Sequence, residues 1–244
     1  MVRAHPTVPK ISCHRFPGLG ITPGVSMGTF IGIDGIPNGW VAVYLNSDGS
    51  QHFARARSVA ELLSGPYDRA MIDMPIGLPE RDYRPCDIDA RKRVGSRVFL
   101  GARSGVWAFK TLGEANAHYW REEGVGRGIS MQLFCIREKL RELNAGPALP
   151  RLFEAHPELI FWHIAGRLLP SKKSREGREE RTKLLEDKGV TSLPLWLGQR
   201  RGTGIGRDDL IDAGTCAIAA RDSTNSLPIG GPNGDGGGQP RIWY

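Results

Sequence analysis

Five carboxylates from four separate segments of the chain are the residues best placed to do chemistry. Asp209 and Asp212 lie three residues apart at the start of an apolar helical run, so a helix would place them on one face. Asp34 and Asp73 each end a short apolar run, and Glu154 lies inside another. Converging carboxylates repel one another at neutral pH unless a cation lies between them. Because none of these candidates is His or Cys, the set suits a hard ion such as Mg²⁺ or Mn²⁺.

The sequence therefore predicts a divalent metal site, with one or two ions. Two ions about 4 Å apart would stabilise both the attacking and the leaving oxygen of a phosphoryl displacement. The predicted metal ligands are Asp34, Asp73, Asp209 and Asp212. Glu154 is predicted as an added ligand or a base, which makes all five acids candidate catalytic residues.

Each of these acids also has a purely structural interpretation. Acids in the first turn of a helix complement its dipole, and Asp208 is in position to cap the helix that begins there. Glu154 would be satisfied by solvent on an edge strand or by a neighbouring arginine. His156, which precedes Pro157, is either a substrate contact or a simple helix cap. A metal site requires the acids to meet in space, and the local pattern leaves this open.

The elements that would position the first two acids form an α/β pattern. Four apolar runs, separated by turns of Gly, Pro, Asn and Asp, predict strands over residues 29–34, 40–45, 51–57 and 69–73. The first three form an antiparallel meander, and a capping box at Ser58 predicts a crossover helix before the fourth. Such a mixed sheet places Asp34 and Asp73 at the carboxyl ends of neighbouring strands, where ligands of open α/β sheets bind.

The second half of the chain predicts an insertion followed by helices. Residues 80–127 are highly charged and weakly periodic, which is typical either of a segment that closes over a substrate or of a solvated helical excursion. Apolar residues at spacings of four and three then predict one helix from Ser130, its cap, to Leu143. A short apolar run at 152–155 follows, and further helices are predicted over 157–169, 172–188 and from Asp208 onward.

Composition favours one globular domain with an anionic partner. The 244 residues are 40% hydrophobic, and the formal net charge is +7. Four cysteines show no metal-ligand spacing, and no apolar run reaches the roughly 20 residues needed to span a bilayer. We expect a cytoplasmic protein without membrane contact, with residues 1–26 as a disordered extension, 27–244 as the domain and 222–240 as a loose tail whose last residues, 241–244, dock back. The predicted phosphate contacts are Arg91, Arg97, Lys172 and Lys173.

Other catalytic motifs are weaker. The glycine-rich loop at 202–206 lacks the strand and the Lys-Ser/Thr signature of a phosphate-binding loop. The sequence contains no H-E-x-x-H or G-x-S-x-G motif, which argues against the common zinc and serine hydrolases.

In the order and spacing of several short segments, the chain resembles domain-of-unknown-function family 429, whose members are described as predicted nucleases of the ribonuclease H fold. The matching segments are 32–35 (GIDG), 39–42 (GWVA), 72–79 (IDMPIGLP), 86–91 (CDIDAR), 128–132 (GISMQ), 154–158 (EAHPE), 172–173 (KK) and 208–213 (DDLIDA). The resemblance runs from Met27 almost to Tyr244. One departure is that prolines expected within 98–112 are absent.

The resemblance implies a ribonuclease H-like mixed sheet flanked by helices, with an inserted region. The acid pattern is also similar to that of Holliday-junction resolvases, which implies a two-metal nuclease. The resemblance to the family further implies that substrate contacts lie in the matching segments, at Ser130, Gln132 and His156.

Three functions therefore compete. The leading hypothesis is a metal-dependent nuclease that hydrolyses phosphodiester bonds of DNA or RNA. The second is a nucleotide-dependent phosphotransferase of the actin-like and sugar-kinase group, which needs a second such core in a chain that looks too short for two. The third is a non-catalytic nucleic-acid-binding module. The sequence does not distinguish DNA from RNA as the substrate. It also leaves open the structure of the substrate and the oligomeric state.

Overall fold

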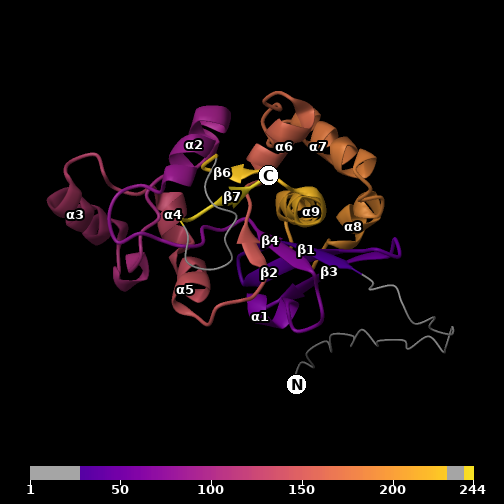
Figure 1. The fold of residues 1–244 in the computed structure, drawn as a ribbon, viewed down its shortest axis with the longest axis horizontal. Coiled ribbons are helices and arrows are strands. Elements are labelled where there is room, and N and C mark those ends of the chain that lie inside the picture. Colours follow the sequence, from indigo (N-terminus) through magenta and orange to yellow (C-terminus); the bar gives the residue numbers. More distant parts are fainter. Residues whose placement is uncertain (1–27, 230–238) are drawn as a thin grey trace, which may run out of the picture.

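A five-stranded mixed sheet forms the centre of the fold (Figure 1). The computed structural model describes residues 28–229 and 239–244, so the predicted extension at 1–26 lies outside the described residues. The strands are β1 (Thr29–Ile36), β2 (Gly39–Asn46), β3 (Gln51–Ala56), β4 (Arg69–Ile72) and β5 (Leu152–Glu154). Their order across the sheet is β3-β2-β1-β4-β5, with β1, β2 and β3 antiparallel and with β1, β4 and β5 parallel. The predicted meander and mixed sheet are confirmed.

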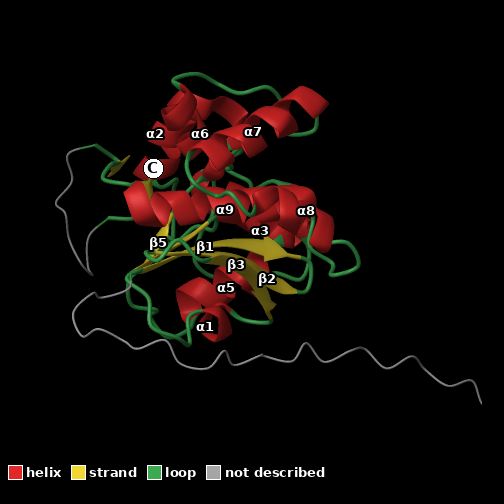
Figure 2. Ribbon diagram, turned by 90° about the vertical axis from the view of Figure 1, so that its right-hand side faces the viewer, coloured by secondary structure: helices red, strands yellow, loops and turns green. Residues whose placement is uncertain are grey.

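Helices cover both faces of this sheet. Figure 2 shows α9 lying across one face, with α1 and α5 on the opposite face. The helices are α1 (Val59–Leu62), α2 (Pro85–Val94), α3 (Leu112–Glu123), α4 (Met131–Cys135), α5 (Arg137–Ala145), α6 (Pro157–Ala165), α7 (Arg175–Asp187), α8 (Leu193–Gln199) and α9 (Arg207–Asp222). The protein is therefore a mixed α/β fold with a helical layer on each side of the sheet.

Side chains alternate between the two faces of the sheet along each strand, so the core has one part on each face. Ile31 and Ile33 are buried on the face that carries α1 and α5, where they pack with Leu140. Val43 is buried on the other face, where it packs with Ile211 of α9. Because side chains alternate along a strand, Gly32 and Asp34 of β1 face α9.

Gly32 allows α9 to lie directly on β1. A Cβ atom added to Gly32 would lie 2.0 Å from both the Ala213 carbonyl oxygen and the Ala217 amide nitrogen. No side chain fits there, so the backbones of strand and helix are in contact. Since Asp34 is two residues beyond Gly32 and Asp212 directly precedes Ala213, this approach brings the two acids to the same end of the sheet.

Four local predictions need correction. The helix predicted over 157–169 ends at Ala165, because Gly166 caps it in the left-handed conformation. The predicted single helix from Ser130 to Leu143 is two helices, because the Ile136 N–H bonds the Leu133 carbonyl, three residues back, and this tighter turn ends α4. The helix expected from residue 172 begins at Arg175. Asp208 is not the cap of α9, since Gly206 holds that position.

The inserted region and the C-terminal segment both pack on the domain. The insertion contains α2 and α3 together with the 3₁₀ turns Gly95–Arg97 and Val106–Ala108. Its Arg103 is fully buried and pairs with Glu123 at 2.6 Å. Near the C-terminus, β6 (Ser226–Leu227) pairs with β7 (Ile242–Trp243), and the latter forms a bridge with Ala155. The predicted docking of residues 241–244 is confirmed, whereas residues 230–238 of the predicted loose tail lie outside the described part of the chain.

Candidate functional site

Three of the predicted metal ligands meet at one cavity of about 550 Å³. Asp34 lies near the end of β1, and Asp73 directly follows β4, where its N–H donates to the Ile33 carbonyl at 3.0 Å. Asp212 enters from α9 and is only 4% exposed. Adjacent strand ends and a helix that crosses them therefore bring together acids that lie far apart in the sequence.

The three carboxyl groups share a buried, electronegative environment. Burial raises the pKa of Asp34 well above its ordinary value, and the charges of Asp73, Asp212 and Asp209 raise it further. The Gly35 N–H, which donates to Asp34 Oδ1 at 2.7 Å, opposes this rise in pKa. Burial also raises the pKa of Asp73 and of Asp212 to about 6. The acids therefore carry their negative charge at an energetic disadvantage.

Lys172 supplies the positive charge closest to this cluster. Its Nζ donates to Asp212 Oδ2 at 2.8 Å, and it lies in the segment that precedes α7. Burial by itself would lower the pKa of Lys172, but Asp212, Asp73 and Asp34 outweigh burial and raise it. The Lys172 charge in turn opposes the rise in pKa of Asp73 and Asp212. The ammonium thus partly neutralises the acids.

The three carboxylates are the type of ligand that a hard divalent cation prefers, but they are not arranged as a ligand shell. Asp34, Asp73 and Asp212 offer only carboxylate oxygens, which Mg²⁺ and Mn²⁺ prefer. Within residues 28–229 and 239–244, however, no group of three or more His, Cys, Asp or Glu side chains is arranged to hold a metal ion. The Lys172 ammonium already bonds one of the three carboxylates. The Lys172 ammonium would therefore compete electrostatically with a metal ion at Asp212.

Glu154 lines the same cavity, but its carboxylate is bound by Arg84. The guanidinium donates to Glu154 Oε2 at 2.6 Å and to Oε1 at 2.7 Å, and it also bonds Asp87. The Ile76 N–H donates to Glu154 Oε2 at 2.8 Å. Burial by itself would lower the pKa of Arg84, but Glu154 and Asp87 raise it well above its ordinary value. Glu154 is therefore paired with an arginine, which was one of the structural interpretations that the sequence left open.

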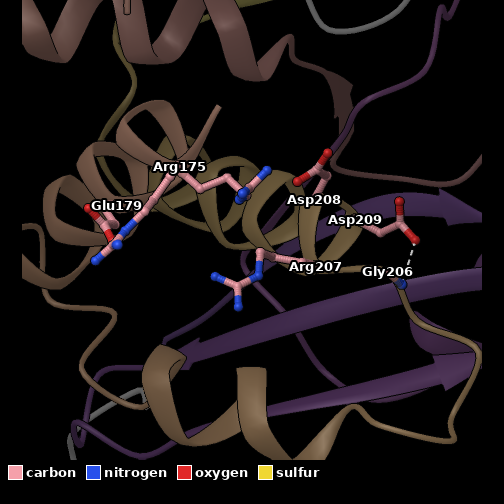
Figure 3. Close-up of a pocket in the computed structure, with 7 residues that line it drawn as sticks. Arg175, Glu179, Gly206, Arg207, Asp208 and Asp209 are labelled. Carbon is pink, nitrogen blue, oxygen red and sulfur yellow. Dashed lines mark hydrogen bonds and ion pairs between the residues drawn. The ribbon is translucent and has the colours of Figure 1, made fainter. Parts of the chain in front are cut away.

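Asp209 does not line the cavity that holds Asp212. Figure 3 shows its carboxylate turned back across the start of α9, where Asp209 Oδ2 accepts the Gly206 N–H at 2.9 Å. A separate cavity of about 630 Å³ is lined by Asp209 together with Asp208, Gly206, Arg175, Arg178, Glu179 and Arg207. Asp209 therefore serves as the capping acceptor of α9, although its charge still raises the pKa of Asp34.

His156 and Arg97, both predicted substrate contacts, line the main cavity. Burial lowers the pKa of His156, and its buried Nδ1 has no hydrogen-bond partner among the described residues. Arg97 pairs with Glu158 and donates to the Leu169 carbonyl at 2.7 Å. Glu158 also accepts two bonds from the buried Arg181, so the Arg97 charge belongs to a paired network.

The other predicted contacts lie farther from the acids. Arg91 and Ser130 line a further cavity of about 530 Å³, which adjoins the main one at Phe99 and is called the second cavity. Ser130 Oγ also accepts the Leu133 N–H at 3.2 Å, which confirms Ser130 as a helix cap. Gln132 and Lys173 are exposed and line neither of these two cavities.

Lys139 and Phe99 line the main cavity and were not among the predicted site residues. Lys139 Nζ lies 4.2 Å from the Trp40 ring centroid and donates to the Gly39 carbonyl. Burial lowers the pKa of Lys139, and the charge of Asp34 opposes this change. The apolar periodicity of its helix indicated only the core-facing positions, so the sequence carried no signal for this lysine.

The comparisons with known proteins identify a family. A family model described as "Protein of unknown function (DUF429)" matches residues 32–230. No curated protein matches the chain, and no solved structure matches it. In the part of the chain that the structure describes, none of the helices has the length and apolar character needed to cross a membrane. Because the match spans most of the chain and includes all three clustered acids, the protein belongs to the DUF429 family.

Proposed function

We propose that the protein is a metal-dependent nuclease of the ribonuclease H-like group. Asp34, Asp73 and Asp212 would hold Mg²⁺ or Mn²⁺ while a phosphodiester bond of nucleic acid is hydrolysed. The observation that carries the proposal is the convergence of these three buried carboxylates, from β1, β4 and α9, in one cavity. The antiparallel meander joined to parallel strands supports the fold assignment.

The electrostatics of the cavity support a cationic occupant. Desolvation and mutual repulsion raise the pKa of the acids, and a bound cation would remove much of this disadvantage. When bound, the ion would polarise a phosphate oxygen and favour ionisation of the attacking water. Lys172, released from Asp212, would then be available to contact a substrate phosphate.

Other residues around the cavity would position the substrate. His156 lines the cavity, and burial lowers its pKa, which favours the neutral imidazole in the cavity wall. Arg84 keeps Glu154 fixed at the end of β5 and also bonds the Ile76 carbonyl. This ion pair makes Glu154 a support for the cavity wall in the proposed mechanism.

The number and size of the sheets disfavour the phosphotransferase alternative. A nucleotide cleft of the actin-like type requires two related cores. Residues 28–229 and 239–244 contain one five-stranded sheet and one two-stranded sheet. The nuclease hypothesis needs only the cavity at the end of the larger sheet.

A combined melting and cleavage experiment tests the proposal. Metal-free protein is titrated with Mn²⁺ while its melting temperature is followed, and labelled single-stranded, duplex and branched DNA and RNA are incubated with the same samples. We expect Mn²⁺ to raise the melting temperature and to support strand cleavage. Asp212→Asn should be at least as stable as the wild type without metal, because a buried charge is removed, but it should lose both metal effects.

Asp208→Asn is the matched control, because Asp208 lies on the same helix as Asp212 but lines the separate cavity of about 630 Å³. It should retain the metal-induced rise and the cleavage. Equal metal shifts in wild type and Asp212→Asn, or no metal-dependent cleavage of any substrate, would refute the nuclease assignment.

A further inference from the structure

Phe99 is a large apolar side chain at the mouth of the candidate site. It is 46% exposed, and it lines both the main cavity and the second cavity. No aromatic ring or cation packs on its ring among the described residues. Nearly half of the Phe99 side chain is therefore accessible to a ligand.

The second cavity contains another aromatic ring, but that ring is already covered. The guanidinium carbons of Arg103 and Arg127 lie 5.3 Å and 4.9 Å from the centroid of Tyr83. These cation–π contacts occupy Tyr83. Phe99 is therefore the ring available for stacking between the two cavities.

Arg91 provides a free cation in the second cavity, which Phe99 also lines. It is exposed, it lines the second cavity, and it forms no ion pair with a described carboxylate. Its recorded bond is a long one, 3.4 Å, to the Val98 carbonyl. By contrast, Arg97, which lines the main cavity, is paired with Glu158. Arg91 is thus free to neutralise an anionic group that reaches the second cavity.

The two cavities present an acid cluster, an aromatic ring and a cation in an order that a nucleic-acid strand can meet. The acids and Lys172 lie in the first cavity, the free ring of Phe99 lies at its junction with the second, and Arg91 lies in the second. Each cavity, at about 550 and 530 Å³, is in the size range of small-ligand pockets. A phosphate, an adjacent base and the next phosphate would meet these groups in turn.

We propose that Phe99 stacks an unpaired base next to the phosphate bound at the acid cluster, and that Arg91 contacts the following phosphate. This inference rests on the proposed function and names its substrate class as single-stranded nucleic acid. In a duplex, each base face is covered by its neighbours, and exposing it would require unstacking. In a single strand, a base is free to stack on an aromatic side chain whatever its sequence.

Binding without catalysis tests the stacking directly. The probe is a fluorescent oligothymidylate of about ten nucleotides, a length within the usual range of single-strand sites, measured by anisotropy at low salt with Ca²⁺, a cation that carboxylate oxygens bind and that neutralises the acid cluster. Phe99→Ala should weaken binding on the order of 10-fold, as expected for loss of one stacked base. Phe99→Trp should retain the affinity of the wild type. Phe99→Leu should bind as weakly as Phe99→Ala, because it keeps apolar volume without an aromatic face.

Trp120→Ala is the matched control, since Trp120 is 45% exposed and lines neither of the two cavities. It should bind oligothymidylate with wild-type affinity. The duplex of the same oligonucleotide with oligoadenylate should bind wild type at least about 10-fold more weakly than the single strand. Thermal melts establish that each variant is folded, and Phe99→Leu decides the question if Phe99→Ala does not fold.

The inference is overturned if Phe99→Leu binds oligothymidylate as tightly as the wild type, or if wild type prefers the duplex. A parallel cleavage assay with Mn²⁺ separates this failure from failure of the proposed function. Cleavage that is unaffected by Phe99→Leu would leave the nuclease proposal intact and remove the stacking role. Ring-dependent binding without any cleavage would support the stacking role and remove the nuclease proposal.

Discussion

The Lys172 ammonium lies 2.8 Å from Asp212 Oδ2, so the acid cluster already has a cation at one of its three members. Lys172 comes from the segment before α7, whereas Asp212 is on α9, and 40 residues separate them in the chain. A divalent ion bound by Asp212 must compete with this ammonium. The lysine therefore links metal affinity, the ionisation of the acids and stability.

Lys172→Gln should lower stability without metal and increase the stabilisation by Mn²⁺. The variant removes a hydrogen-bonded charge from Asp212 and also removes the competitor of the ion. Because the lysine side chain is 42% exposed, we expect a modest loss of about 1 kcal/mol. Urea denaturation with and without Mn²⁺ measures both effects. Lys173→Gln, which changes the exposed neighbouring lysine, is the control, and an identical Mn²⁺ response in the two variants would contradict competition at Asp212.

The stability of the metal-free protein should depend on pH through Asp73 and Asp212. Burial raises the pKa of each from 3.8 to about 6 in the folded state, so the folded protein binds more protons than the unfolded chain between these values. Their contribution to stability is present below about pH 4 and is lost as the pH rises through about 6. A shift of this size corresponds to about 3 kcal/mol for one group.

Urea denaturation in EDTA at pH 5 and pH 7 measures this effect. Asp212→Asn should show a smaller loss of stability from pH 5 to pH 7 than wild type, since it lacks one of the two titrating groups. Asp208→Asn, outside the cavity, should keep the wild-type pH dependence. An equal pH dependence in wild type and Asp212→Asn would show that the buried acid does not titrate in this range.

Arg84→Ala should destabilise the protein strongly. The variant leaves Glu154 and Asp87 buried without their common partner, and breaking a buried ion pair costs about 3–5 kcal/mol. Arg81→Ala is the matched control, because the Arg81 side chain is 65% exposed in its pair with Glu122. That variant should change the free energy of unfolding by less than about 1 kcal/mol. Similar losses in the two variants, measured by urea denaturation, would contradict the role assigned to Arg84.

Gly32→Ala should separate α9 from β1. The added Cβ would overlap the backbone of Ala213 and Ala217, so we expect a loss of about 3 kcal/mol or more and a weaker Mn²⁺ effect in any folded variant. Gly214→Ala is the control within α9, since the nearest atom to its added Cβ is a Leu185 methyl at 3.5 Å. It should be neutral or stabilising by up to about 1 kcal/mol, because Ala favours the helix. Thermal and urea melts distinguish the two, and equal stability of both variants would contradict the proposed close contact.

The sequence by itself determined the first four strands and the positions of Asp34 and Asp73 at the end of the sheet. Both follow from short-range rules, because apolar runs bounded by turn residues form strands and each of these acids lies where such a run stops. The strand pairing confirms this part of the prediction, since Ile33 and Ile72 lie side by side in parallel strands. The Ser58 and Ser130 caps were also predictable, because a cap depends only on nearby residues.

Only the tertiary structure decided which acids share the cavity. Asp209 and Asp212 have the spacing of one helical face, but Asp209 bonds the Gly206 N–H while Asp212 bonds Lys172. For Glu154 the sequence left solvent and an arginine open as partners, and the structure provides Arg84, which lies 70 residues earlier in the chain. The contact of Gly32 with α9, which brings Asp212 to Asp34, likewise joins residues about 180 positions apart. Local propensity cannot specify such pairs, because they depend on which elements pack against each other after the chain has folded.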